Sequence, residues 1–247
     1  MGAASGLPGG ARDGHEPVRI GVLALQGAFA EHLRALRAVG AEPVEVRLPA
    51  HLEGLHGLVL PGGESTTIRK LVDRWGLREP VMALAASGAP IFGTCAGMIL
   101  VAREIAGGEE PVFPLLDVTV RRNAFGRQLE SFETDLSIPV LGDTPVHGVF
   151  IRAPIIERIG PGVDILATLP DGRIVAVRER NVVAVAFHPE LSGETRFHRL
   201  IFAMASEHAE PGEGSGRKHH PVRRGRPADI LDREGTRTSE SRRGAEG

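Results

Sequence analysis

The single cysteine of the chain lies in a pattern that suits a nucleophile. Cys95 is the only cysteine among 247 residues, and it stands in Gly93-Thr94-Cys95-Ala96-Gly97 with a glycine two residues before it and two after it. An apolar segment precedes this sequence and a helical pattern follows, as in the sharp strand-to-helix turn that presents a nucleophile in G-x-nucleophile-x-G motifs. At such a turn the helix N-terminus favours a thiolate. A lone cysteine is otherwise most often an inert core residue, and position alone leaves that alternative open.

A thiolate that attacks an acyl group needs a general base, and the base needs an orienting group. The apolar segment "VVAVAF" runs directly into His188, Pro189 and Glu190. Residues i and i+2 of an extended chain project to one side, and proline favours an extended conformation for the residue before it. Glu190 is therefore predicted to reach the imidazole of His188 and fix its tautomer, as the third member of a triad does. The alternative is that His-Pro-Glu only ends a strand and enters a turn.

Acyl transfer also needs N–H donors for the developing oxyanion. The backbone N–H of Ala96, next after the cysteine, is one candidate. Gly62-Gly63 in "LVLPGGEST" forms a permissive turn that offers a second. A glycine-rich turn before a helix is also typical of phosphate sites. That interpretation is weak, because the chain has neither G-x-x-x-x-G-K-[ST] nor a strand followed by G-x-G-x-x-G.

The elements that would position these residues alternate between strand and helix in the first half. We expect strands within 18–27, 42–47, 55–63 and 89–93, and helices over 28–40, 65–76, 79–88 and 96–108. The second half is strand-like within 115–122, 131–138, 146–153, 163–169, 172–179 and 181–189, with a last helix over 193–208. The pattern predicts a single α/β domain, with a mostly parallel sheet, helices on both faces and antiparallel additions.

Composition limits the partners and the cellular location that the protein is expected to have. The net charge of -2 gives no general reason to expect nucleic acid or a membrane surface as a partner. No apolar run approaches the roughly 20 residues of a membrane span, and the N-terminus lacks a secretory signal pattern, so we expect a cytoplasmic protein. Residues 1–17 are expected to form a flexible leader, 18–208 the working domain and 209–247 a disordered tail. The basic run "RKHHPVRRGR" of that tail could touch phosphates, but a solvated segment is favoured.

The quoted motifs together resemble a known family. "GTCAGM" with a downstream "HPE" is similar to the class I, or triad, glutamine amidotransferases, which have a flavodoxin-like three-layer fold. "GVLALQGAFAEH", "LPGGESTT", "GTCAGMI", "RRNAFGRQLESFE", "VFIRAP" and "AFHPEL" follow the order of the glutaminase subunits of pyridoxal 5'-phosphate synthase. The resemblance covers about residues 18–206. "PGGESTT", "RNAFGRQ" and "FIRAP" carry it at the level of the subfamily.

The resemblance assigns roles to individual positions. It makes Cys95 the nucleophile, His188 the general base and then acid, and Glu190 the orienting partner. It implies an oxyanion hole from Gly63 and Ala96, with no metal and no organic cofactor. The positions that it places at L-glutamine are Gly63, Glu64, Ser65, Arg122, Ile151 and Arg152. Arg122 and Arg152 remain open to a simpler interpretation as surface ion-pair residues.

The resemblance also implies a partner. Family glutaminases pass ammonia to a (β/α)₈-barrel synthase subunit that makes pyridoxal 5'-phosphate for vitamin B6 biosynthesis, in an assembly of twelve copies of each subunit. The "LQGAFAEH" region, including Gln26 and Glu31, matches the docking face, although both could be ordinary strand-end and helix-surface residues. Two alternatives are another cysteine-elbow hydrolase, such as a γ-glutamyl hydrolase, and an inactive partner-binding subunit.

Overall fold

A computed structural model describes residues 16–122 and 131–210. The leader predicted for 1–17 and the tail predicted for 209–247 lie almost wholly outside these residues, as does the "NAFGRQLE" segment at 123–130. The final helix ends at Ala209, one residue beyond the predicted end of the working domain. Among the described residues, no helix combines the length and the apolar character needed to cross a bilayer.

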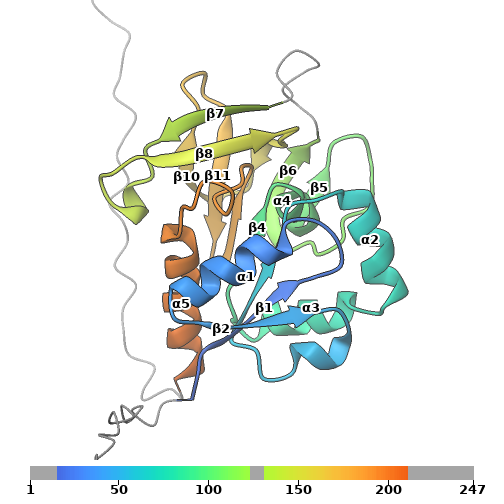
Figure 1. Ribbon diagram of the computed structural model, residues 1–247. Helices are drawn as coiled ribbons and strands as arrows, with labels where there is room; N and C mark the ends of the chain where they lie inside the picture. Colours follow the sequence, from blue (N-terminus) through green and yellow to red (C-terminus); the bar gives the residue numbers. More distant parts are fainter. Residues whose placement is uncertain (1–15, 123–130, 211–247) are drawn as a thin grey trace, which may run out of the picture. The chain divides into compact units, whose positions relative to one another are not determined.

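Five parallel strands form the part of the fold that leads into Cys95, and Figure 1 labels β1, β2 and β4 among them. They follow one another in space in the order β2-β1-β3-β4-β12, and every neighbouring pair is parallel. Their bounds are β1 (Arg19–Leu23), β2 (Glu42–Val46), β3 (Gly57–Leu60), β4 (Ile91–Thr94) and β12 (Val182–Val185). This is the flavodoxin-like strand order, in which ligands bind beyond the carboxyl ends of the strands. β4 runs directly into Cys95, so the cysteine stands at that edge.

Helices cover both faces of these strands, as predicted. They are α1 (Phe29–Ala38), α2 (Ser65–Arg74), α3 (Arg78–Ala86), α4 (Ala96–Val101) and α5 (Arg196–Ala209). The alternation of side chains along β4 separates the two faces. Phe92 stacks on Phe197 of α5, with ring centroids 5.6 Å apart, whereas Gly93 lies against the backbone of Gly97 in α4. The helices α1 and α5 also contact each other.

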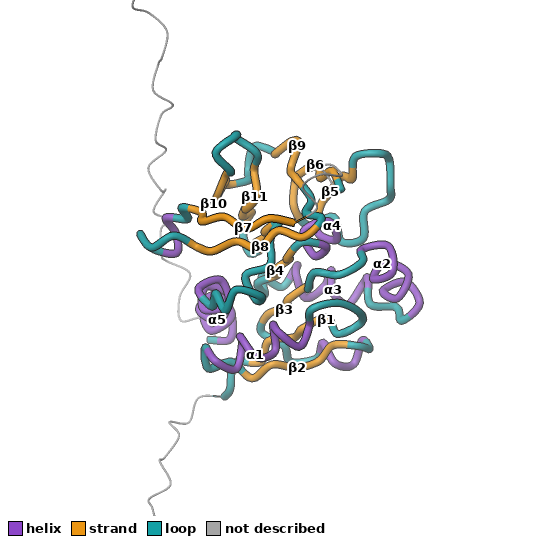
Figure 2. The backbone as a smooth tube through the Cα atoms, turned by 45° about the horizontal axis from the view of Figure 1, so that its top comes forward, coloured by secondary structure: helices purple, strands orange, loops and turns teal. Residues whose placement is uncertain are grey.

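The second half of the chain extends the sheet with β11, β9, β6 and β5, and β10 pairs with β11. The bounds are β5 (Ala102–Ile105), β6 (Leu116–Arg121), β9 (Ile155–Ile159), β10 (Asp164–Thr168) and β11 (Ile174–Glu179). All these pairings are antiparallel except β5 with β6. β7 (Ser131–Leu136) and β8 (Val146–Ile151) were expected as additions to the sheet, but they form a separate antiparallel pair (Figure 2). Two short 3₁₀ helices occupy Pro49–Leu52 and Pro139–Leu141.

The predicted helix over 96–108 is wrong beyond Val101. α4 has six residues, all buried, and the backbone turns extended at Ala102, with φ -65° and ψ 141°. Ala102–Ile105 then pairs with β6. The residues after Val101 are good helix formers, so pairing with β6 has overridden local propensity. A strand over Ile155–Ile159, between two neighbours in the sheet, was not predicted at all.

Candidate active site

The backbone at Cys95 has the strained geometry expected of a nucleophile elbow. Its φ is 49° and its ψ is -103°, in the positive-φ region that non-glycine residues rarely occupy. The Cys95 N–H donates to the carbonyl of Val185 in β12, at 2.8 Å, and fixes the turn to the sheet. A Cβ at Gly97 would lie 1.9 Å from the carbonyl oxygen of Leu60, so only glycine fits there. The two flanking glycines thus permit the close approach that holds the turn in this conformation.

His188 and Glu190 meet as predicted, but in a different local conformation. β12 ends at Val185, so His188 lies beyond the strand, and Pro189 and Glu190 lie in a turn. The His188 N–H donates to the carbonyl of Val149 in β8, at 2.8 Å, and holds the turn against the β7–β8 pair. Nδ1 of His188 then lies 2.7 Å from Oε1 of Glu190. Both side chains are nearly excluded from solvent.

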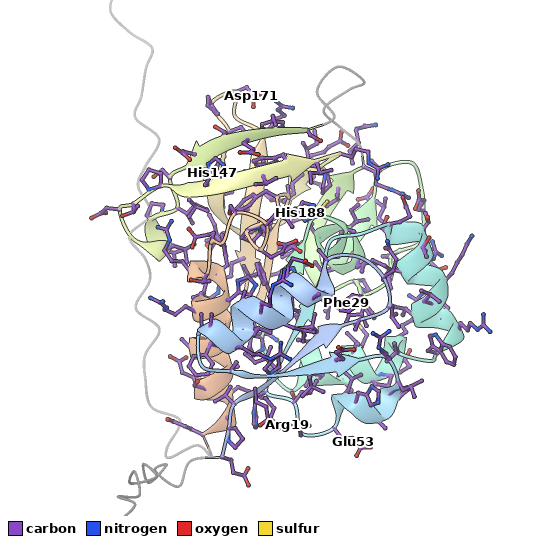
Figure 3. All side chains as sticks on the ribbon, viewed as in Figure 1. Arg19, Phe29, Glu53, His147, Asp171 and His188 are labelled. Atoms are coloured by element: carbon purple, nitrogen blue, oxygen red, sulfur yellow. The ribbon has the colours of Figure 1, made fainter. Side chains whose placement is uncertain are left out.

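The imidazole of His188, which is labelled in Figure 3, interacts with the thiol of Cys95. Burial alone lowers the pKa of His188, but hydrogen bonds to Cys95 and Glu190, together with their negative charge, outweigh burial and raise it to about 10. The ring is therefore an imidazolium at neutral pH.

The turn after β3 closes over the pair. A Cβ at Gly62 would lie 2.3 Å from Cε1 of His188 and 3.3 Å from Cβ of Cys95, so this backbone borders both side chains directly. The Gly62 N–H donates to Oγ1 of Thr94 at 3.0 Å, and the Glu64 N–H donates to Oε1 of Gln26 at 2.7 Å. In sequence, Gly63 lies between these two residues, whose N–H groups already donate hydrogen bonds within the protein. Ala96 is the first residue of α4. Both backbone groups predicted for the oxyanion hole therefore lie at this edge of the sheet.

The remaining predicted contacts gather around the start of α2. Glu64 is the N-cap of this helix and accepts hydrogen bonds from the backbone N–H and the hydroxyl of Thr66. The Arg122 guanidinium donates to Glu64 at 3.1 Å and to both carboxylate oxygens of Glu109 at 3.0 Å. Hydrogen bonding from Thr66, with help from the charges of Arg122 and Arg152, holds the pKa of Glu64 below its ordinary value. Ser65, the first residue of α2, is buried.

Ile151 and Arg152 reach the site from the end of β8. The carbonyl oxygen of Ile151 lies 3.8 Å from Sγ of Cys95, so the end of this strand borders the thiol. Arg152 has a φ of 44° and is exposed. Its charge acts on Glu64, but among the described residues no side-chain hydrogen bond fixes it. Within the same residues, no group of three or more His, Cys, Asp or Glu side chains is arranged to hold a metal ion.

Three buried polar residues at the site were not predicted from the sequence. Thr94 bonds to the Gly62 N–H, His32 of α1 lies 3.1 Å from Oγ1 of Thr94, and His198 of α5 lies 2.8 Å from His32. All three are completely excluded from solvent. The available signal was periodicity, because His32 shares the buried face of α1 with Leu33 and Leu36. A histidine at such a position must have a polar partner inside the protein.

Sequence and structure comparisons give the same relationship. Residues 22–207 match the SNO glutamine amidotransferase family. The "Pyridoxal 5'-phosphate synthase subunit PdxT" of Dehalococcoides mccartyi (strain CBDB1) is 58% identical over 190 residues, which are 76% of this chain and 97% of the relative. The protein of the same name from Geobacillus kaustophilus is 57% identical over 190 residues, 77% of this chain and 96% of the relative.

Solved structures agree. A crystal structure of a glutamine amidotransferase superposes with a TM-score of 0.72 at 51% identity, covering 76% of this chain and 98% of that one. PurLQS from Thermotoga maritima superposes with a TM-score of 0.58 at 18% identity, over 79% of this chain and all of that one, and supports the fold alone. With its elbow cysteine, adjoining histidine and parallel sheet, the chain belongs to the SNO glutamine amidotransferase family.

Proposed function

We propose that this protein hydrolyses L-glutamine to L-glutamate and ammonia through a thioester on Cys95, and delivers the ammonia to a pyridoxal 5'-phosphate synthase subunit. One observation carries the chemistry. A strained, positive-φ cysteine lies beside an imidazolium that is itself held by a buried carboxylate at 2.7 Å. This is the arrangement of nucleophile, acid–base group and orienting group that acyl transfer requires.

The first half of the reaction makes the thioester. With the proton on His188, the sulfur of Cys95 attacks the side-chain carbonyl carbon of glutamine, and the carbonyl π electrons move to the oxygen. The N–H groups of Gly63 and Ala96 stabilise the resulting oxyanion. His188 then donates its proton to the amide nitrogen. The C–N bond breaks, ammonia leaves, and a γ-glutamyl thioester remains on Cys95.

The second half consumes water. Neutral His188 now removes a proton from a water molecule, and the hydroxide adds to the thioester carbonyl at the same oxyanion site. Collapse of this intermediate re-forms the carbonyl and breaks the C–S bond, which leaves the sulfur as a thiolate beside protonated His188. The new γ-carboxyl group loses its proton to water, and glutamate leaves. Glu190 keeps Nδ1 of the ring engaged throughout, so Nε2 faces the reacting atoms in both halves.

Recognition of glutamine uses the cluster at the start of α2. The Arg122 guanidinium is suited to the α-carboxylate of the substrate, and the Glu64 carboxylate to its α-ammonium group. Arg122 is held in place by Glu109 and Glu64, so it is oriented before glutamine arrives. Gly63, Ser65, Ile151 and Arg152 complete the proposed contacts around the side chain of the substrate.

The partner follows from the names of the relatives and from the chemistry of ammonia. Relatives at 55–58% identity are named as subunits of pyridoxal 5'-phosphate synthase, so a second subunit belongs with each of them. Ammonia released into bulk water is protonated and loses its nucleophilicity, so direct transfer to an acceptor enzyme is needed. We propose a (β/α)₈-barrel acceptor in an assembly of twelve copies of each subunit, located in the cytoplasm.

Gln26 and Glu31 belong to the proposed docking segment. Gln26 is already bound to the turn above Cys95, whereas Glu31 pairs with Arg34 on the surface.

The test is glutamine-dependent release of ammonia and glutamate by the chain mixed with a synthase subunit of this family. We expect release from the unaltered chain and none from Cys95→Ala, while Cys95→Ala still co-purifies with the partner. Release of ammonia by Cys95→Ala would remove the assigned nucleophile. No release by the unaltered chain in the mixture would refute the glutaminase activity itself.

A further inference from the structure

A buried pair of histidines lies directly behind the candidate triad. His32 comes from α1 and His198 from α5, and the two side chains are completely excluded from solvent. Nδ1 of His32 and Nε2 of His198 are 2.8 Å apart, so one ring donates to the other. Phe92 of β4 packs edge-on against both rings. The proposed reaction uses neither histidine.

One nitrogen of His32 contacts both Glu190, which holds His188, and Thr94, which holds the turn after β3. Its Nε2 lies 3.1 Å from Oγ1 of Thr94 and 3.5 Å from Oε2 of Glu190. Thr94 in turn accepts the N–H of Gly62, the residue that borders Cys95 and His188. A single ring therefore connects the carboxylate that holds the imidazole with the turn that is proposed to hold the oxyanion.

The charges of these groups favour one arrangement of protons. Burial, with the nearby histidines, lowers the pKa of His32 well below its ordinary value, and burial lowers that of His198 to about 4, so both rings are neutral at pH 7. Oε2 of Glu190 is buried and has no hydrogen-bond partner within the described residues. A proton on Nε2 of His32 faces this oxygen favourably, whereas a lone pair there would repel it. In that tautomer His198 donates from Nε2 to Nδ1 of His32, and its own Nδ1 is a buried acceptor with no hydrogen-bond partner within the described residues.

We propose that His32 is a positioning residue, whose buried ring fixes the Glu190 carboxylate and, through Thr94, the Gly62–Gly63 turn. An apolar side chain could fill the same space without the cost of burying two imidazoles. The contacts of His32 with Glu190 and Thr94 therefore give a reason for two buried histidines at this place. His198 acts on the site only through His32, since its Nε2 fixes the ring orientation of its neighbour.

Two substitutions separate this role from a packing role. The side-chain amide of glutamine reaches the place of an imidazole Nε2, and that of asparagine the place of Nδ1. His32→Gln therefore retains a donor toward Glu190 and Thr94, whereas His32→Asn retains only the contact with His198. His32→Gln gives up the contact with His198, and His32→Asn gives up those with Thr94 and Glu190, so the folding of each variant is checked by circular dichroism and urea unfolding. His147→Gln, at an exposed histidine paired with Glu133 and Asp135, is the control for loss of a histidine.

The inference rests on the proposed glutaminase activity, and the experiment measures kcat and KM for glutamine with the synthase subunit present. We expect kcat of His32→Asn to fall roughly 10- to 100-fold with KM nearly unchanged, because the reacting groups shift while the substrate contacts stay. His32→Gln should recover most of this loss, and His147→Gln should match the unaltered chain. Equal activities of His32→Asn and the unaltered chain, or equal losses in both His32 variants, would overturn the inference. Inactivity of the unaltered chain would instead refute the proposed function.

Thr94 gives an independent test if the His32 variants do not fold. Thr94→Ser keeps the hydroxyl that bonds to Gly62 and His32, whereas Thr94→Val keeps the shape and removes it. We expect a loss of kcat in Thr94→Val and near-normal kcat in Thr94→Ser, with both proteins folded by circular dichroism. Full activity of Thr94→Val would contradict a role for this connection.

Discussion

Replacing Gly62 by alanine should disable the site without disturbing the fold. The φ of Gly62 lies outside the positive region, so alanine is compatible with the backbone. The added Cβ, however, would lie 2.3 Å from Cε1 of His188, where ordinary contact begins at about 3.4 Å. The ring must therefore move by about 1 Å, although Glu190 holds Nδ1, the ring atom next to Cε1, at 2.7 Å. A displacement of that size costs on the order of 100-fold in rate, or about 2.7 kcal/mol in activation free energy.

The assay is the initial rate of glutamate formation with the synthase subunit present, over a range of glutamine concentrations. Gly162→Ala is the matched control, because a Cβ there meets nothing nearer than Oε1 of Glu179, at 3.5 Å. We expect kcat/KM to fall about 100-fold in Gly62→Ala and to stay unchanged in Gly162→Ala, with similar melting temperatures. A folded Gly62→Ala protein with normal kcat/KM would refute the claim that this backbone sets the position of His188.

Three further outcomes follow from the contacts described above. The pKa of His198 falls from 6.5 to about 4 on folding, so at this ring the unfolded chain binds more protons between these values. Its contribution to the free energy of unfolding should therefore drop by about 2 kcal/mol on going from pH 7 to pH 5. The measurement compares the pH dependence of urea unfolding in the unaltered chain and in His198→Gln, and an equal pH dependence in the two proteins would contradict this. Because the pKa of His188 is about 10, its acid form persists at neutral pH, so the alkaline decline of kcat/KM should begin only as the pH rises toward 10; an alkaline decline centred near pH 6.5 would contradict the raised pKa of His188. Asn181→Ala removes two hydrogen bonds, to the carbonyls of Ala85 and Ala89, and should cost about 1–3 kcal/mol in urea unfolding; an unchanged free energy of unfolding would contradict this.

Local sequence was sufficient to predict those features whose geometry is determined within one element or one short segment. The glycines around Cys95 predicted the elbow, because a backbone with φ of 49° at the cysteine needs small neighbours. The spacing of His188 and Glu190 predicted their contact. Alternating apolar segments predicted the parallel strands and the helices that cover them, since burial on both faces requires apolar residues throughout.

Prediction failed where distant segments decide the outcome. The residues after Val101 have helical propensity, and only pairing with β6 makes Ala102–Ile105 a strand. The β7–β8 pair looks like any other antiparallel addition until its partners are known. His32 and His198 are 166 residues apart, and no local pattern shows that two buried helix faces bring their rings together behind Glu190.

The most direct test of the central claim is chemical capture of the acyl group during turnover. The chain and its synthase partner would be mixed with isotopically labelled glutamine, quenched in acid and digested, and the labelled peptide identified by mass spectrometry. We expect a γ-glutamyl group on the peptide that contains Cys95, and none when His188 is replaced by asparagine. Steady glutamine hydrolysis with no label on Cys95, or with label on another residue, would contradict the account.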